Sequence, residues 1–287
     1  MAGSLSDDLK SAIRKNVADA LAEDIGGGDL TSGLIDADNV LGAQIIAREA
    51  LVLAGQHWVD EVYAQLDSSI IIDWYVADGQ SASADDVICK LVGPARALLT
   101  GERTALNFLQ TLSATATTTA RHAEAISGTH TLLLDTRKTL PGLRQAQKYA
   151  VRCGGGLNHR LGLYDAILIK ENHIRSAGSI AAAMDAARDA GVDVLIEVEV
   201  ESQTQLLEAL DAGATRILLD NFSVEELRQV VAINGEYGYA KAELEASGNI
   251  TLENIRSIAE TGVDYISTGA LTKNVDAIDM SMLFRID

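Results

Sequence analysis

The residues at 196–201 alternate aliphatic side chains with three glutamates, Glu197, Glu199 and Glu201. Side chains alternate faces along a β-strand, so the three carboxylates share one face and the aliphatic residues the other. In a strand covered by helices the aliphatic face packs against those helices, which leaves the glutamates pointing inward. Because a buried, unpaired carboxylate is strongly unfavourable, this pattern predicts basic side chains, a metal ion or a ligand opposite the glutamates.

A cluster of basic residues in an acidic chain is the natural partner for these carboxylates. The chain has a formal net charge of −18, yet residues 135–175 hold eight lysines and arginines against three acids. An acidic surface repels nucleic acid and anionic membranes, whereas a local basic cluster predicts a small polyanionic ligand. Lys148 and Arg152 fit the exposed face of a helix, but Arg137, Lys138 and Lys170 follow apolar strands.

The elements that must position these residues alternate regularly after residue 128. Short apolar runs end at six positions, namely Asp135, Lys170, Val200, Asp220, Ser247 and Gly269. Helical patterns, such as those at 179–190 and 202–212, lie between most of them. This alternation predicts parallel strands joined by right-handed crossovers. Six or seven such units indicate an α/β barrel rather than an open sheet. Barrel enzymes carry their active residues at the carboxyl ends of the strands.

Small residues follow the last two of these strands, at Ser247–Gly248 and at 267–270. Such loops allow backbone N–H groups to approach a phosphate. The predicted pocket therefore suits a ligand with acidic groups at one end and a phosphorylated sugar at the other, with carboxylates on ribose hydroxyls or Mg²⁺. The CGGGLNHR segment at 153–160 either cradles an anion or caps the preceding helix, and His159 beside Arg160 favours a site.

The first half of the chain lacks this rhythm and predicts an α+β domain. Helices are expected at 7–22, 56–66 and 101–126, strands at 43–48 and 70–76, and a glycine-rich turn at 23–32. The two cysteines, Cys89 and Cys153, are expected to be reduced thiols. There is no signal-peptide pattern and no apolar run near the about 20 residues that a membrane span needs, so we expect a cytoplasmic protein.

Several long motifs resemble one enzyme family. They are LLLDTRKTLPGLRQAQKYAVRCGGGLNHRLGLYDAILIKENHI at 132–174, EDIGGGDLTS at 23–32, GERTALNFLQ at 101–110, and the later IEVEVES, ILLDNF, LEASGNI and TGVDYISTGALTK. Together they resemble the quinolinate phosphoribosyltransferases, which are also called carboxylating nicotinate-nucleotide pyrophosphorylases. The resemblance extends over nearly the whole chain.

The resemblance implies a fold and an activity. An N-terminal open-faced α+β sandwich would occupy residues 1–111, with the tail at 274–287 packing back on it. An incomplete, seven-stranded α/β barrel would occupy 112–273. The enzyme would transfer phosphoribosyl from phosphoribosyl pyrophosphate to quinolinate with decarboxylation, giving nicotinate mononucleotide, carbon dioxide and pyrophosphate for NAD synthesis. It would use Mg²⁺ and no organic cofactor. It would be a homodimer in which Arg103 reaches the partner's site.

The resemblance also assigns roles to residues. Arg137, His159, Arg160 and Lys170 would hold the quinolinate carboxylates, and Lys138 would also face phosphate. Glu199 and Asp220 would face the ribose and Mg²⁺, and Ser247, Gly248 and Gly269 would take the 5-phosphate. Thr136, Asn249, Thr268 and Ala270 complete the predicted substrate-binding set. The catalytic residues would be Lys138, Lys170, Glu199 and Asp220.

Three alternatives remain open on the sequence. A related phosphoribosyltransferase, such as the molybdenum-transport-associated relatives, would use another acceptor. A Schiff-base aldolase would use Lys170, but a lysine nucleophile must lose its proton, and acidic neighbours oppose this. A non-catalytic barrel would act as a scaffold, although a scaffold has no use for three inward glutamates.

Overall fold

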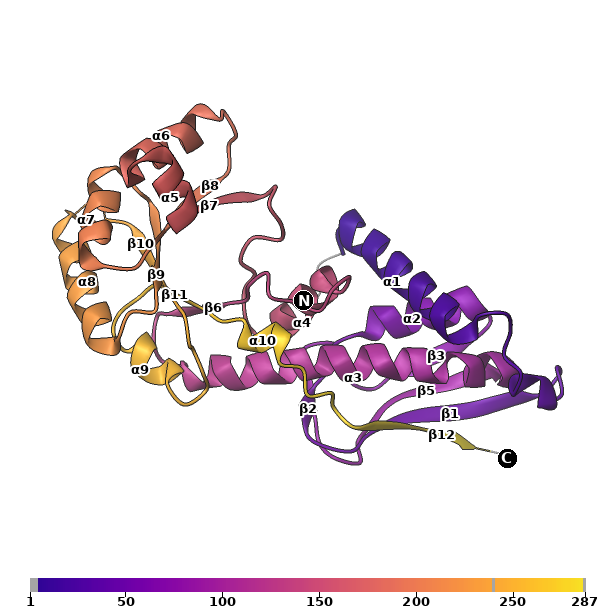
Figure 1. Cartoon of the computed structure of the whole chain (residues 1–287). Helices are drawn as coiled ribbons and strands as arrows, with labels where there is room; N and C mark the ends of the chain where they lie inside the picture. Colours follow the sequence, from indigo (N-terminus) through magenta and orange to yellow (C-terminus); the bar gives the residue numbers. More distant parts are fainter. Residues whose placement is uncertain (1–4, 239–240, 286–287) are drawn as a thin grey trace. The chain divides into compact units, whose positions relative to one another are not determined.

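The computed structural model describes residues 5–238 and 241–285 of the chain. These residues form two compact units (Figure 1). The first contains the chain up to residue 120 together with 139–155 and the residues from 271 onward, and the second contains 121–138 and 156–270. The predicted boundary at 111–112 falls inside a single helix, α3 (Ala95–Ala125).

An antiparallel sheet forms the base of the first unit, with the strand order β12-β1-β5-β3. The strands are β1 (Val40–Ala47), β3 (Ile71–Trp74), β5 (Val87–Pro94) and β12 (Met280–Arg285), and a small second sheet pairs β2 (Leu51–Val52) with β4 (Ser81–Ala82). Ile45 and Leu91 on one face are fully buried, whereas Ile71 and Val92, which are register partners, are exposed. The sheet is thus covered on one face, as in an open-faced sandwich.

Helices of the first unit follow the apolar periodicity of the sequence. In α1 (Asp7–Ile25), residues one turn apart are buried, and the Ser6 side chain caps the start by accepting a hydrogen bond from the Leu9 N–H. The helix ends at Gly26, whose φ of 53° favours glycine. The unit also contains the short 3₁₀-helix η1 (Ser32–Leu34), α2 (Gln56–Leu66) and α4 (Arg144–Cys153).

One expectation for α4 is wrong. Arg152 is exposed, as predicted, but Lys148 is only 1% exposed. The neighbouring Ala146 and Gln147 are buried as well, so this short helix is enclosed on most of its circumference. Gln147 donates to the carbonyl of Thr272 (2.8 Å), which anchors the helix inside the unit. Composition alone does not distinguish such a helix from a surface helix.

The second unit is a parallel sheet with helices on its outside (Figure 1). Its strand order is β6-β11-β10-β9-β8-β7. The strands are β6 (Leu132–Leu134), β7 (Ala166–Ile169), β8 (Leu195–Val200), β9 (Arg216–Asp220), β10 (Glu243–Ser247) and β11 (Tyr265–Ser267). The helices are α5 (Glu171–Ala177), α6 (Ile180–Asp189), α7 (Gln203–Asp211), α8 (Val224–Glu236) and α9 (Ile255–Ala259). The short helix α10 (Ala270–Lys273) follows β11, and its residues from 271 onward belong to the first unit.

The seventh strand of the expected barrel is reduced to one contact within the described residues. Beyond β6 there is a single parallel bridge, between Leu134 and Leu157. The chain after Leu157 leaves the ladder because the backbone N–H of His159 bonds to the Asp135 side chain instead of a strand backbone (2.9 Å). The sheet is therefore an incomplete barrel with consecutive strands β6 and β7 toward its two edges.

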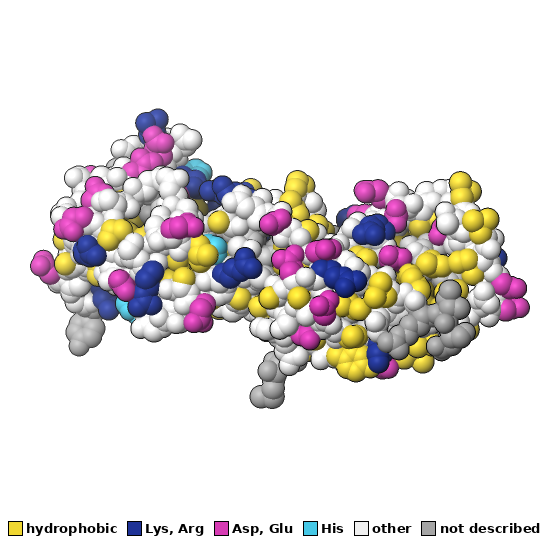
Figure 2. Space-filling model, turned by 90° about the horizontal axis from the view of Figure 1, so that it is seen from below, with side chains coloured by type: hydrophobic (Ala, Val, Ile, Leu, Met, Phe, Trp, Pro, Cys, Tyr) yellow, Lys and Arg dark blue, Asp and Glu magenta, His cyan; other side chains and the backbone are white. Residues whose placement is uncertain are grey.

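Surface features agree with an acidic globular chain. On the face shown in Figure 2, acidic and basic side chains are interspersed, so the negative net charge is not gathered into one block there. No helix in the described part of the chain is both long and apolar enough to cross a membrane.

Candidate active site

The glutamates of β8 line the inside of the incomplete barrel, as their alternation predicts. Glu197 is 1% exposed, and the side chain of Glu199, two residues further along the strand, is 13% exposed. Val198 and Val200, on the opposite face, are fully buried. Glu201 differs from the expectation, because it lies one residue beyond the end of the strand and is exposed.

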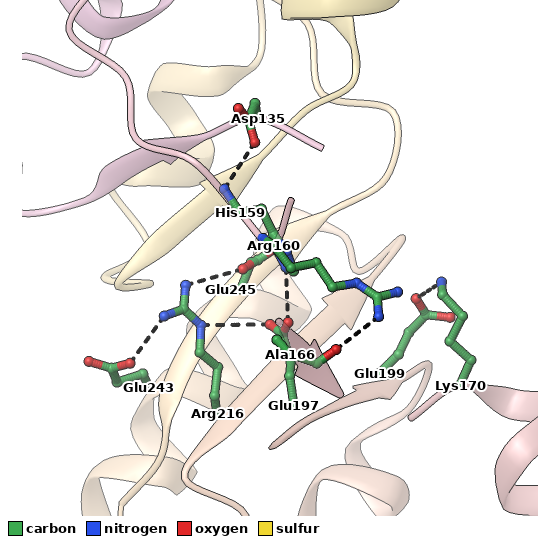
Figure 3. Close-up of polar contacts among 10 residues, drawn as sticks. All are labelled: Asp135, His159, Arg160, Ala166, Lys170, Glu197, Glu199, Arg216, Glu243 and Glu245. Atoms are coloured by element: carbon green, nitrogen blue, oxygen red, sulfur yellow. Dashed lines mark hydrogen bonds and ion pairs between the residues drawn. The ribbon is translucent and has the colours of Figure 1, made fainter. Parts of the chain in front are cut away.

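A basic and an acidic residue meet at the carboxyl ends of β7 and β8. The Lys170 ammonium group forms an ion pair and hydrogen bond with the Glu199 carboxylate (Figure 3). Lys170 precedes α5, and its backbone N–H donates to the Nδ1 atom of His173 (2.9 Å), which sets where the strand turns into the helix. About half of the Lys170 side chain is exposed, so its charge can reach a ligand from the solvent side.

Arg160 brings a second positive charge to this edge. Its guanidinium group donates to the carbonyl of Ala166, at the start of β7 (3.2 Å, Figure 3). Desolvation lowers the pKa of Arg160, as does the positive charge of Arg137, while Glu197 and Glu199 oppose the shift. The Lys170–Glu199 ion pair and the bond from Arg160 to Ala166 together bring predicted basic and acidic residues to strands β7 and β8.

The loop that carries Arg160 is fastened at both ends by carboxylates. The fully buried Asp135, just after β6, accepts hydrogen bonds from the Asn158 side chain (2.6 Å) and the His159 N–H (2.9 Å). Asp165, just before β7, accepts from the backbone N–H groups of Leu161 (2.6 Å) and Gly162 (2.9 Å). Asp135 is therefore an organising residue, although the sequence suggested only that it ends a strand.

A network of buried charged side chains inside the barrel centres on Arg216. The sequence analysis did not single out this residue. The guanidinium contacts Glu243 and Glu245 at 3.3 Å and Glu197 at 3.7 Å (Figure 3). It also lies 3.6 Å from the centre of the Tyr265 ring. In the register of the sheet, Arg216 opens β9 opposite a glutamate in each neighbouring strand, and this pairing is visible only once the strands are aligned.

His159, Glu197 and Glu245 could be taken for a metal site, because a ligand atom of each lies within 4.8 Å of the others. The Arg216 guanidinium, however, already supplies a cation to both carboxylates. Burial raises the pKa of Glu245 to about 7, helped by the adjacent charge of Glu197 and opposed by the charge of Arg216. We therefore describe the cluster as an ion network.

The carboxyl ends of β9 and β10 are joined by a compact polar turn. Asp220 ends β9 and accepts a hydrogen bond from Asn221 (2.8 Å), and Asn221 accepts one from the side chain of Asn249 (3.1 Å). Gly248 lies between, with a φ of 95°; a Cβ atom there would be 2.2 Å from Asn221 Oδ1 and 2.9 Å from its backbone nitrogen. The backbone after Ser247 thus depends on glycine.

The segments that follow β6 and β11 also lie close together. A Cβ atom on Gly269 would lie 2.8 Å from the Lys138 side chain, so Lys138 crosses the small-residue loop. Thr136 accepts a hydrogen bond from the Lys138 N–H (3.1 Å), and Thr268, which is buried, accepts one from the Ala270 N–H (3.1 Å). The predicted cation and the predicted phosphate loop are therefore neighbours.

Arg103 belongs to the first unit, on α3, and its side chain is exposed. Its predicted part in a partner's site stays a prediction.

Comparison with known proteins gives a consistent result. The family model described as quinolinate phosphoribosyl transferase, C-terminal domain, matches residues 115–283, and the N-terminal domain of the same family matches 29–113. A probable nicotinate-nucleotide pyrophosphorylase [carboxylating] of Bacillus subtilis is 45% identical over 261 residues, which is 91% of this chain and 89% of that protein. The Mycobacterium leprae enzyme of that name is 41% identical, covering 97% of this chain and 99% of its own.

A solved structure, the nicotinate-nucleotide pyrophosphorylase from Francisella tularensis, superposes with a TM-score of 0.92 at 48% identity and covers 96% of this chain and 97% of its own.

Proposed function

The chain belongs to the quinolinate phosphoribosyltransferase family, and on that premise we propose that it transfers the phosphoribosyl group of phosphoribosyl pyrophosphate to quinolinate. The products are nicotinate mononucleotide, carbon dioxide and pyrophosphate. The observation that carries the proposal is the Lys170–Glu199 ion pair at the carboxyl ends of β7 and β8, with the Arg160 guanidinium bound to the carbonyl of Ala166 in the same strand β7. Such an edge suits a diacid beside a sugar whose reacting carbon becomes cationic.

The basic side chains bind and orient quinolinate. Arg137 and Arg160 are planar donors that match a carboxylate with two hydrogen bonds, and Lys170 adds a mobile point charge. His159 completes this arm from the adjacent loop position. A substrate with two carboxylates gains more from such a cluster than one with a single carboxylate, which favours quinolinate over nicotinate as acceptor.

The acidic side chains act on the sugar. As the bond between C1 and the pyrophosphate oxygen breaks, positive charge develops on C1, and the Glu199 carboxylate stabilises it. The pyridine nitrogen then forms the new bond to C1. Asp220 binds ribose hydroxyls, and the glycine-dependent backbone at Ser247–Gly248 and at Gly269 receives the 5-phosphate, as supported by their adjacent positions at the barrel edge. Asn249, Thr136, Thr268 and Ala270 lie in the same two turns.

Decarboxylation follows from the chemistry of the new pyridinium. The bond between C2 and its carboxylate breaks, carbon dioxide leaves, and the electron pair remains on C2, where the positive ring nitrogen stabilises it. A proton is then added at C2. Lys138, which is exposed beside Gly269, is a cation able to stabilise the developing charge.

The acidic edge also fits Mg²⁺ by the chemistry of its donors. Glu199 and Asp220 offer the oxygen ligands that Mg²⁺ prefers, directly or through retained water. When bound with phosphoribosyl pyrophosphate, the ion would neutralise charge on the leaving pyrophosphate. No organic cofactor enters the proposed reaction.

We further propose a cytoplasmic homodimer, in which Arg103 of each subunit binds substrate in the partner's barrel. The exposed position of Arg103 on α3 supports an intermolecular contact.

The test is a product analysis by mass spectrometry. The protein is mixed with Mg²⁺, phosphoribosyl pyrophosphate and quinolinate labelled with ¹³C in the 2-carboxylate. We expect unlabelled nicotinate mononucleotide and labelled carbon dioxide. Product formation from nicotinate and none from quinolinate would instead favour a related phosphoribosyltransferase, and a borohydride-trapped adduct on Lys170 would favour the aldolase.

A further inference from the structure

The ion network around Arg216 lies outside the set of residues to which the proposed reaction assigns a role. Its two inner carboxylates, Glu197 and Glu245, are 1% and 0% exposed, and the Arg216 side chain is 12% exposed. Replacing a buried ion network by apolar residues of similar volume is often neutral or stabilising. A contribution to stability is therefore a weak explanation for these buried charges. A role in positioning another residue explains them better.

His159 is the last residue of the network. The contacts of its imidazole ring indicate which ring nitrogen carries a proton. The Nδ1 atom accepts a hydrogen bond from the Arg160 N–H (2.8 Å) and so carries no proton. The Nε2 atom lies 2.9 Å from Glu197 Oε2 and 3.5 Å from Glu245 Oε1. Since an ionised carboxylate only accepts hydrogen bonds, Nε2 carries the proton, and His159 is a neutral imidazole.

The same two bonds connect the network to the diacid-binding arm. A protonated Nδ1 would place its hydrogen against the Arg160 N–H, so the Arg160 peptide keeps its position only while His159 is neutral. Arg216 neutralises part of the negative charge that Glu197 and Glu245 direct at the ring. Without that guanidinium, two buried carboxylates would favour an imidazolium.

We propose that Arg216, Glu197 and Glu245 are positioning residues that hold His159 in the neutral Nε2–H form and thereby hold Arg160 for the diacid substrate. The network acts through His159 and does not itself touch the reacting atoms. This proposal rests on the proposed function, because it assigns Arg160 to the quinolinate carboxylates.

The first experiment needs no variant of the network. Nitrogen-15 NMR of the histidine-labelled protein reports which ring nitrogen is protonated, and the His159 signals are assigned by their loss in His159→Gln. We expect a neutral Nε2–H imidazole at pH 7.5. An imidazolium or an Nδ1–H form would overturn the proposal. This result is independent of turnover, so it separates failure of the inference from failure of the proposed function.

The second experiment compares Arg216→Met with Glu243→Gln. Glu243 contacts the same guanidinium from the outer side, where it is about half exposed. In Arg216→Met we expect His159 to remain protonated to higher pH and the KM for quinolinate to rise about 10- to 100-fold, with the KM for phosphoribosyl pyrophosphate changed less than about threefold. Glu243→Gln should leave both constants within about twofold.

A merely structural role for Arg216 gives a different pattern. Both KM values would then change together, with no change in the His159 signals, and this result would overturn the proposal. If Arg216→Met does not fold, Arg216→Lys replaces it, because lysine keeps the charge but cannot bridge both carboxylates. Adding Glu245→Gln to Arg216→Lys removes one of the two carboxylate charges, so we expect this double variant to recover part of the quinolinate affinity that Arg216→Lys loses; no recovery would also count against the proposal.

Discussion

Lys170 and Glu199 form an ion pair between neighbouring parallel strands, at the carboxyl ends of β7 and β8. The pair joins the two charged arms that the sequence predicts separately. Because Glu199 is largely buried while Lys170 is half exposed, a ligand reaching this edge meets the ammonium group first. In the proposed reaction, the diacid binds on the lysine side and the sugar on the glutamate side.

The pair should behave as a unit in mutagenesis. Lys170→Met and Glu199→Gln should each lower kcat/KM by about 10- to 100-fold, since a hydrogen bond to a charged group contributes about 1.5–3 kcal/mol. The double variant should lose less than the product of the two effects, because the residues contact each other. Steady-state kinetics of all four proteins measures the coupling, and fully multiplicative losses would mean that the pair has no joint role. Arg175→Met, in an exposed pair on α5, is the matched control and should change kcat/KM less than about twofold.

A methyl group at position 248 should damage the turn between β9 and β10. Gly248→Ala places a Cβ atom 2.2 Å from Asn221 Oδ1 at a φ of 95°, so we expect a loss of about 1–3 kcal/mol in the free energy of unfolding and a higher KM for phosphoribosyl pyrophosphate. Chemical denaturation and initial rates measure the two effects.

The control for this variant is Gly235→Ala, in α8. That glycine has no positive φ, and no atom lies within 4 Å of the place that an added Cβ would occupy. Alanine also favours helices over glycine by up to about 1 kcal/mol. If the two substitutions had equal effects, the turn at Gly248 would not require glycine.

Glu245 makes stability depend on pH in a defined direction. Its pKa is raised from 4.5 to about 7, so the folded state binds this proton more tightly than the unfolded state. The resulting stabilisation is complete below pH 4.5 and is lost as the pH rises toward 7. Glu245→Gln removes this dependence, so its unfolding free energy relative to the natural protein should rise between about pH 5 and 8, by at most about 3 kcal/mol at about 1.4 kcal/mol per pKa unit. A difference that stays constant over this range would refute the assignment.

Shared active sites predict complementation between inactive chains. Arg103→Ala and Lys138→Ala proteins should each have little activity, because each lacks one cation of the proposed site. After the two are mixed and allowed to exchange subunits, some dimers contain one site with both cations, and about a quarter of natural activity is the upper limit when exchange is random. Activity is measured before and after exchange. Mixing two batches of Arg103→Ala is the control, and absence of recovery in the mixed sample would argue against a donated Arg103.

The sequence predicts the local elements well because their signals are local. The apolar spacing of α1, the helical patterns of α6 and α7, and the alternation in β8 each arise from neighbouring residues. The same alternation locates the buried Glu197, and the strand ends locate Lys170, Glu199 and Asp220. The family resemblance, which the comparisons confirm, rests on motifs in the linear chain.

The tertiary structure decides what depends on residues far apart in sequence. The burial of Lys148, the exposure of Glu201, the reduction of the seventh strand to one bridge, and the position of Arg216 between Glu197 and Glu245 all depend on register and enclosure. A sequence pattern predicts which face of an element is apolar, but only the packing of the fold determines what lies opposite a charged side chain. For this protein, the amino-acid order alone determined the family and the charged residues of the barrel edge, whereas the fold determined which of those charges meet, because charges meet in space and not along the chain.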